Sequence, residues 1–197
     1  TGELITLDLI KYHIKNVRSE LIKNDLNKGR SVDSWIIQDL GCIEVEQVDR
    51  AECCSTDLGC YFLRTKVQIP SPIELHNKQL ITRIGPIDKI ARPYDEIKYN
   101  RIPYVGRNRY SKNLIKTFTK DNDGYIYLLV NTDLSDLLIE RINIQGVFED
   151  PELAADFRQC DNTPCYTDDA AFPVKAWMIR TIQDIVISRF IVPESKA

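Results

Sequence analysis

The amino-acid sequence predicts an α+β fold in which an antiparallel β core is flanked by an N-terminal and a C-terminal amphipathic helix. Near both ends of the chain, apolar residues recur every three or four positions, which is the period of a helix. Between these ends, several short segments alternate apolar with polar residues, as strands with one face in water do. We expect residues 1–197 to form a single domain, because a chain of this length buries a sufficient core without a staple.

Residues 1–28 are predicted to form the N-terminal helix. Thr6 suits its N-cap position, and Asp8 lies in the first turn, where a negative charge complements the helix dipole. Residues 24–29 supply the breakers that end it. Its apolar seam consists of Leu7, Ile10, Ile14, Val17 and Leu21.

The β-rich core is predicted over residues 35–148. Its clearest element is a hairpin around the turn 121–124, where Gly124 tolerates a positive φ. Four prolines interrupt residues 71–112, so we expect long loops there. Further alternating strands are expected at 42–48, 61–70 and 140–148.

The C-terminal helical part is predicted over residues 150–197, with a closing helix of about five turns between Pro173 and Pro193. Apolar residues nearly surround this helix, which is typical of a helix buried on several sides. We expect it to pack against the β core and against a neighbouring subunit, with Arg180 and Asp184 on the wetter side. The centre of that interface would hold Trp177, Met178, Ile182 and Ile185.

Four carboxylates between residues 149 and 156 raise the question of a catalytic or metal site. The start of a helix explains them better. Asp150 is a favoured N-cap, Pro151 suits the first helical position, and Glu152 complements the dipole. A catalytic interpretation needs a partner that this segment does not supply. We therefore predict that Asp150 is a helix cap.

Charge is unevenly distributed along the chain. Residues 83–120 carry ten Lys or Arg against three acids, with tyrosines between them, whereas residues 131–170 carry ten acids against two arginines. Two solvated faces explain this pattern most simply. Alternatively, the basic stretch follows a phosphate backbone. In a third interpretation it meets the acidic stretch of the next subunit in a head-to-tail ring, with Arg101, Arg107 and Arg109 at the subunit interface.

The whole-chain composition narrows the function further. A net charge of −3 gives no general attraction to nucleic acid or to an anionic membrane. No run approaches the ~20 apolar residues of a membrane span, and the charged N-terminus is unlike a signal peptide. No nucleophile–base pair or cofactor motif is recognisable, so we expect no enzyme and no cofactor. The turn 121–124 lacks the bidentate Glu of a calcium loop.

Six cysteines are too few for a disulfide scaffold in a chain of this length, which indicates a reducing compartment and small buried thiols. A zinc site is the alternative, but the spacing of zinc ribbons and fingers is absent. Its ligands would come from Cys53, Cys54, Cys60, Cys160 and Cys165.

Five segments, in this order, resemble a known family: residues 53–76, 80–88, 126–131, 142–157 and 172–190. Among them are "LITRIGPID", "INIQGVFEDPELAADF" and "FPVKAWMIRTIQDIVISRF". Together they resemble a virion structural protein of crAss-like bacteriophages, of the head-to-tail connector or ring type. The resemblance covers the chain from about residue 43 onward.

This resemblance implies a non-enzymatic, ring-forming protein located in the virion and assembled in the cytoplasm of the bacterial host. Its partners would be further copies of itself in a cyclic homo-oligomer that matches the twelvefold symmetry of the portal, the portal itself, and neighbouring tail or ring proteins. Phage DNA would pass through the lumen without sequence specificity, and no membrane would be involved. A tail structural protein of the same virion, or a nucleic-acid-binding module that uses residues 83–120, are the alternatives.

Overall fold

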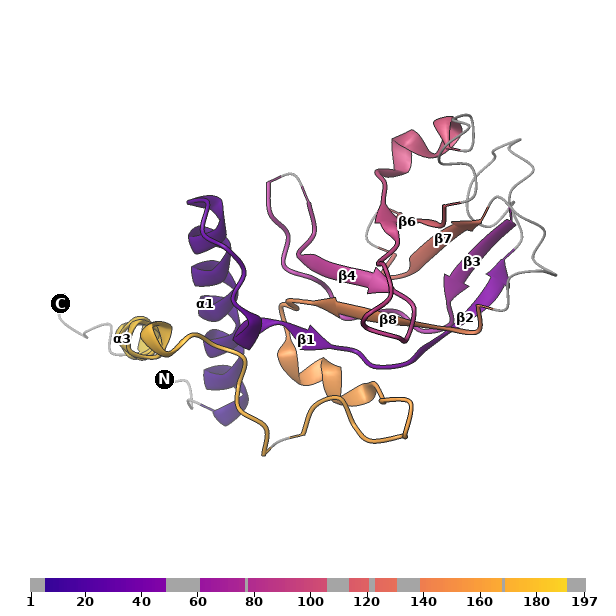
Figure 1. Cartoon of the computed structure of the whole chain (residues 1–197). Helices are drawn as coiled ribbons and strands as arrows, with labels where there is room; N and C mark the ends of the chain where they lie inside the picture. Colours follow the sequence, from indigo (N-terminus) through magenta and orange to yellow (C-terminus); the bar gives the residue numbers. More distant parts are fainter. Residues whose placement is uncertain are drawn as a thin grey trace.

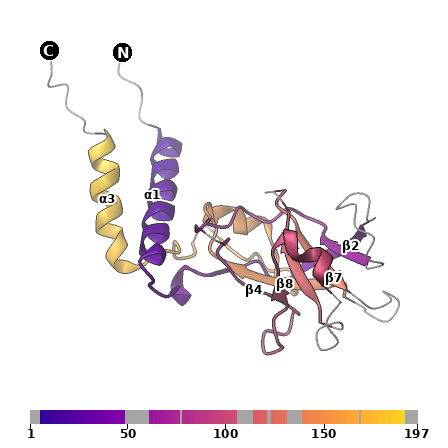
Figure 2. The same ribbon diagram turned by 90° about the horizontal axis from the view of Figure 1, so that it is seen from above.

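The computed structural model describes residues 6–48, 61–76, 78–105, 114–120, 123–130, 139–167 and 169–190. Within these ranges, a pair of helices lies at one end and a curled sheet of eight strands at the other (Figure 1). The two helices are antiparallel and side by side, and they stand apart from most of the sheet when seen from above (Figure 2). The predicted α+β fold is confirmed.

The first helix, α1, spans Leu7–Asn27 and agrees with the prediction. The Thr6 hydroxyl accepts a hydrogen bond from the Leu9 N–H at 3.3 Å, so the expected N-cap is formed. The last described helix, α3, spans Ala176–Phe190 and begins later than predicted. It begins three residues after Pro173, because that proline precedes the helix instead of lying in its first turn.

The packing of α3 corrects one prediction. α1 lies between α3 and the sheet, so α3 packs on α1 and not on the β core (Figures 1 and 2). Met178 and Ile182 are buried, Ile185 is half-buried, and Arg180 and Asp184 are exposed, as expected. Trp177, expected at the centre of the contact, is 50% exposed. Ile179 and Ile187 are exposed on the same helix. A single layer beneath α3 covers only one of its sides.

The eight strands are short and almost entirely antiparallel; β5 and β6 form the parallel pair. Their order in the sheet is β1-β8-β2-β3-β7-β6-β5, and β4 pairs with β8. Their bounds are β1 Gln38–Asp39, β2 Ile43–Val48, β3 Tyr61–Thr65, β4 Ile81–Gly85, β5 Asp95–Glu96, β6 Lys116–Thr119, β7 Ile126–Val130 and β8 Arg141–Gly146. Among the described residues, short 3₁₀ helices lie between α1 and β1 (η1, Ser34–Ile36), between β5 and β6 (η2, Tyr99–Tyr104) and between β8 and α3 (η4, Pro151–Asp156).

The predicted hairpin is confirmed as β6 and β7, and Gly124 in its turn has a φ of +76°. The prediction of long loops over residues 71–112 is wrong in part, because β4, β5 and η2 lie there. The prolines fall between these elements or inside η2, so they do not interrupt a strand. β4 pairs with β8 from Ile81 to Gly85, with a shift of register between Ile81 and Arg83, and branches from β8 outside the main order of strands.

A bend between β1 and β2 gives the sheet its curl. Both strands pair with β8, Gln38 opposite Gly146 and Ile43 opposite Ile142, and then β2 leaves β8 to pair with β3. Gly41 at the bend has a φ of +68°, which a residue with a side chain adopts only at a cost. A Cβ at this position would also collide with the carbonyl oxygen of Arg158.

Arg18 fastens the helix pair to the sheet. Its side chain is fully buried on α1. Nε donates to the Pro173 carbonyl at 2.7 Å, and Nη1 donates to the Phe148 carbonyl at 2.8 Å. Burial lowers the pKa of Arg18 to about 10. One guanidinium therefore joins α1, the end of the β8 segment and the segment that leads into α3.

Candidate interface surfaces

Residues 86–92, in the loop between β4 and β5, are held by side chains. The Arg83 guanidinium donates to three of their carbonyl oxygens: Pro86 at 3.2 Å, Asp88 at 2.9 Å and Ala91 at 3.2 Å. The Asp88 carboxylate accepts a hydrogen bond from the Ile90 N–H at 2.9 Å. We call residues 86–92 the presented loop. Side chains hold its backbone in place, although the loop pairs with no strand.

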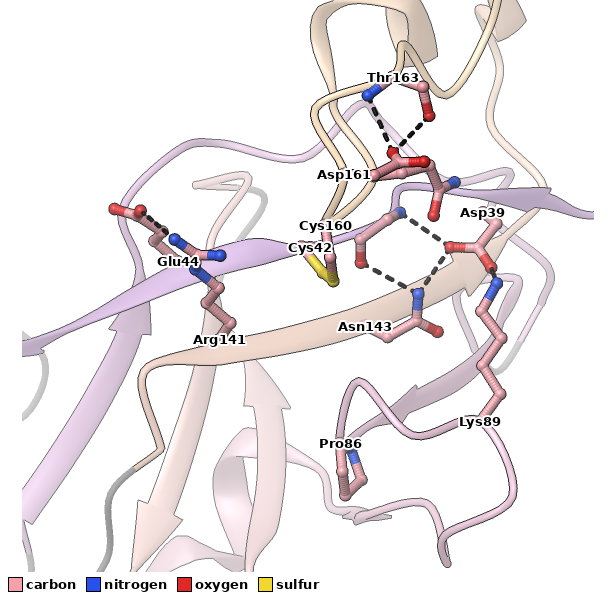
Figure 3. Close-up of a disulfide and its surroundings, with 12 residues drawn as sticks. Asp39, Cys42, Glu44, Pro86, Lys89, Arg141, Asn143, Cys160, Asp161 and Thr163 are labelled. Carbon is pink, nitrogen blue, oxygen red and sulfur yellow. Dashed lines mark hydrogen bonds and ion pairs between the residues drawn. A yellow bond between two sulfur atoms is a disulfide. The ribbon is translucent and has the colours of Figure 1, made fainter.

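A polar network ties the presented loop to the bend between β1 and β2 (Figure 3). Lys89 forms an ion pair with the Asp39 carboxylate at 2.7 Å. The buried Asn143 of β8 donates to Asp39 at 2.6 Å and to the Gly41 carbonyl at 3.0 Å, and it accepts from Arg83 at 3.2 Å. Burial alone would raise the pKa of Asp39, but hydrogen bonds, first that from Lys89, outweigh it and hold this pKa below 3.8.

The presented loop carries two exposed isoleucines. Ile90 is 96% exposed, and Ile87 is exposed to a smaller extent. Ile90 therefore makes almost no contact with its own chain. An isoleucine gains roughly 1.5–3 kcal/mol on full burial, so a fixed loop that shows one to water is suited to a contact with another surface.

A second apolar surface lies at the helix pair. An open cavity of about 1020 Å³ has both tryptophans of the sequence in its wall. Trp35 on η1 is 80% exposed. We call this cavity the helix groove; its apolar lining includes Trp35, Phe172, Val174, Trp177 and Ile179.

A buried carboxylate keeps the walls of the helix groove in place. Asp25, near the end of α1, accepts from Lys175 at 3.2 Å and from Arg30 at 2.6 Å. Burial would raise the pKa of Asp25, but these hydrogen bonds outweigh it and lower the pKa from 3.8. Because Lys175 directly precedes α3, this carboxylate sets the spacing between the two helices.

The acids at residues 149–156 make contacts that hold the fold together. The Asp150 carboxylate accepts from the Glu152 N–H at 3.0 Å and lies at the N-cap of η4, which is a 3₁₀ helix. Asp150 and Glu152 also bind Lys15 of α1, at 2.8 and 2.7 Å. Burial would lower the pKa of Lys15, but the hydrogen bonds to the two carboxylates outweigh it and raise this pKa above 10.5. The acids therefore anchor α1 to the sheet.

The cysteines differ from the prediction. Cys42, at the bend, forms a disulfide with Cys160, 118 residues later, with their Cα atoms 5.2 Å apart. The expectation of reduced thiols is wrong for this pair, and Cys160 is not free to bind zinc. Cys165 has a half-buried thiol whose pKa is raised to about 11, mainly by burial. Cys53, Cys54 and Cys60 lie outside the described residues, and within those residues no group of three potential ligands surrounds a metal site.

Much of the positive charge in the basic stretch is used inside the chain. Lys89 binds Asp39, and Arg92 and Lys116 both bind Asp95. Arg101 is exposed on η2, whereas Arg107 and Arg109 lie outside the described residues. These internal ion pairs weaken the case for a continuous phosphate-binding surface, because a cation that pairs with a carboxylate is less able to neutralise a phosphate and release its counterion.

The sequence alone did not single out Trp35, Ile87, Ile90 or the residues that hold their loop. A signal was present, since two isoleucines stand among polar residues between Pro86 and Pro93. A search for periodic patterns assigns such isolated apolar residues to a loop.

In the part of the chain that the structure describes, no helix is long and apolar enough to cross a membrane.

Comparison with known proteins identifies the family. The family model described as phage tail ring protein 2 matches residues 3–192. Ring protein 2 of Bacteroides phage crAss001 is 26% identical over 199 residues, which cover 98% of this chain and 82% of that protein. Because the family model spans nearly the whole sequence, the chain belongs to the phage tail ring protein 2 family of crAss-like phages.

Proposed function

We propose that this chain is a non-enzymatic structural protein of a phage virion, which assembles as a closed ring of identical subunits in the head-to-tail connector below the portal. Membership of the ring protein family is the observation that carries the proposal. Phage DNA passes through the lumen without sequence-specific contacts, and the portal and neighbouring tail or ring proteins bind the two faces of the ring. A symmetry that matches the twelvefold portal is part of the proposal.

The exposed apolar side of α3 supports assembly. Trp177, Ile179 and Ile187 face solvent on a helix whose other side is fully packed. Large apolar side chains that remain uncovered in a single chain favour a protein–protein contact. We therefore propose that α3 packs against a neighbouring subunit through these residues.

Microscopy of the purified protein tests the proposal. Negative-stain images at increasing protein concentration should show annular particles, and sedimentation should give one assembled species with a fixed number of subunits. A matched sample in high salt should retain the ring if apolar contacts dominate. A protein that stays monomeric at all concentrations, both alone and with its portal, would contradict the proposed function.

A further inference from the structure

We infer that the presented loop of one subunit inserts Ile90 into the helix groove of the next subunit, so that the contact between neighbours in the ring is head-to-tail. This inference rests on the proposed function, because it names the contact that closes the ring. It commits to one occupant of the groove, a second copy of this chain.

The two surfaces cannot meet within one chain. Ile90 is almost fully exposed, although the loop that carries it is fixed by Arg83 and Lys89. β4 runs away from the helix pair, so the loop after Gly85 begins at the end of the strand farther from α1 and α3 (Figure 1). The groove at Trp35 and Trp177 therefore remains open to another molecule.

The chemistry of the two surfaces is complementary. The loop offers isoleucines, and the groove offers aromatic walls with an open cavity large enough for them. The charges are also of opposite sign. The groove wall includes the carboxylate of Asp33, and the loop carries Arg92, whose side chain is 71% exposed although it also lies 3.4 Å from Asp95. In the proposed contact, Arg92 of one subunit pairs with Asp33 of its neighbour.

Two different surfaces on one chain produce a ring and not a closed dimer. In a two-fold contact the same patch meets itself, so either the loop or the groove would stay uncovered. A heterologous contact uses the loop of each subunit and the groove of the next, and it closes when the rotation per subunit divides the circle. Fixing the loop before assembly also reduces the entropy lost on binding.

Substitution of exposed residues tests the contact without disturbing the fold. Ile90→Asp should raise the protein concentration needed for assembly at least tenfold, since it places a charge in an apolar groove. Val67→Asp is the control, because Val67 is also an exposed apolar residue but lies outside both surfaces. Asp33→Arg should weaken assembly, and combination with Arg92→Asp should restore it in part. If Ile90→Asp assembles like the parent, the inference is wrong while the ring itself stands.

Cross-linking gives an independent measurement. A chain with Arg92→Cys and Asp33→Cys, which keeps Ile90 and Trp35, should form, under oxidation, a reducible ladder that extends beyond dimers. The two single-cysteine variants, which keep all native cysteines, are the controls and should give no such ladder. A ladder that stops at dimers, or no ladder from a protein that microscopy shows as rings, would overturn the head-to-tail contact. A protein that forms no rings at all would instead count against the proposed function.

Discussion

Gly41→Ala tests whether the bend between β1 and β2 organises the molecule. The residue has a φ of +68°, and the left-handed conformation costs a residue with a Cβ about 1–2 kcal/mol. The new Cβ would also displace the Arg158 carbonyl, which accepts from the Cys42 N–H at 2.9 Å. Loss of a buried hydrogen bond adds roughly 1–3 kcal/mol. We expect the free energy of unfolding to fall by about 2–5 kcal/mol in total.

Gly29→Ala is the matched control for this measurement. Gly29 has a φ of +81°, but nothing lies within 4 Å of a Cβ placed there. Its substitution should therefore cost only the conformational part, about 1–2 kcal/mol. Urea titration followed by tryptophan fluorescence and circular dichroism gives both values, provided that the slope with urea is unchanged. Equal losses for the two variants would refute the argument that the bend is tightly packed.

Three further predictions concern the residues that hold the helices and the bend. Cys160→Ser should lower the free energy of unfolding by up to about 5 kcal/mol, because the disulfide closes a loop of 118 residues. Reductant should destabilise the parent protein but not this variant. A parent protein whose stability is unchanged by reductant would contradict this. Asp150→Ala should cost about 0.5–2 kcal/mol as a lost cap, measured by thermal or urea unfolding, and an unchanged midpoint would argue against the cap. The pKa values of Asp25 and Asp39 are lowered in the folded protein, so the stabilisation that their charged forms provide is complete above pH about 4 and is lost as the pH falls further. Asp25→Asn should therefore make the stability of the protein decline less steeply in acid. An equally steep decline in the variant would contradict this linkage.

Local signals in the sequence predicted the elements that depend on local chemistry. Thr6 caps α1, Gly124 turns the β6–β7 hairpin, and the Asp150 carboxylate accepts the backbone hydrogen bond expected of an N-cap. In each case neighbouring residues determine the conformation. The family resemblance to crAss-like ring proteins was likewise confirmed by the match over residues 3–192.

Features that depend on distant residues were not predictable in this way. The partner of Cys42 lies 118 residues away, and no spacing indicates it. β4 was missed because prolines surround a strand of five residues, and its place in the sheet comes from pairing with β8. The exposure of Trp177 within one chain was not foreseen, because periodicity shows that a helix is apolar but not how many layers cover it.

Mixing two defective variants tests whether neighbouring subunits meet head-to-tail through Ile90 and Trp35. Ile90→Asp removes the apolar tip of the loop but keeps the groove, whereas Trp35→Asp disables the groove but keeps the loop. Both residues are exposed, so each variant should fold and remain monomeric when alone. The mixture should form one intact contact per pair, since one variant supplies the loop and the other the groove.

Sedimentation of the equimolar mixture should show heterodimers and nothing larger, because the outer ends of each pair carry the two defects. The parent protein under the same conditions should form the complete ring. Monomers alone in the mixture, or a ring formed by either single variant, would contradict the head-to-tail contact through Ile90 and Trp35.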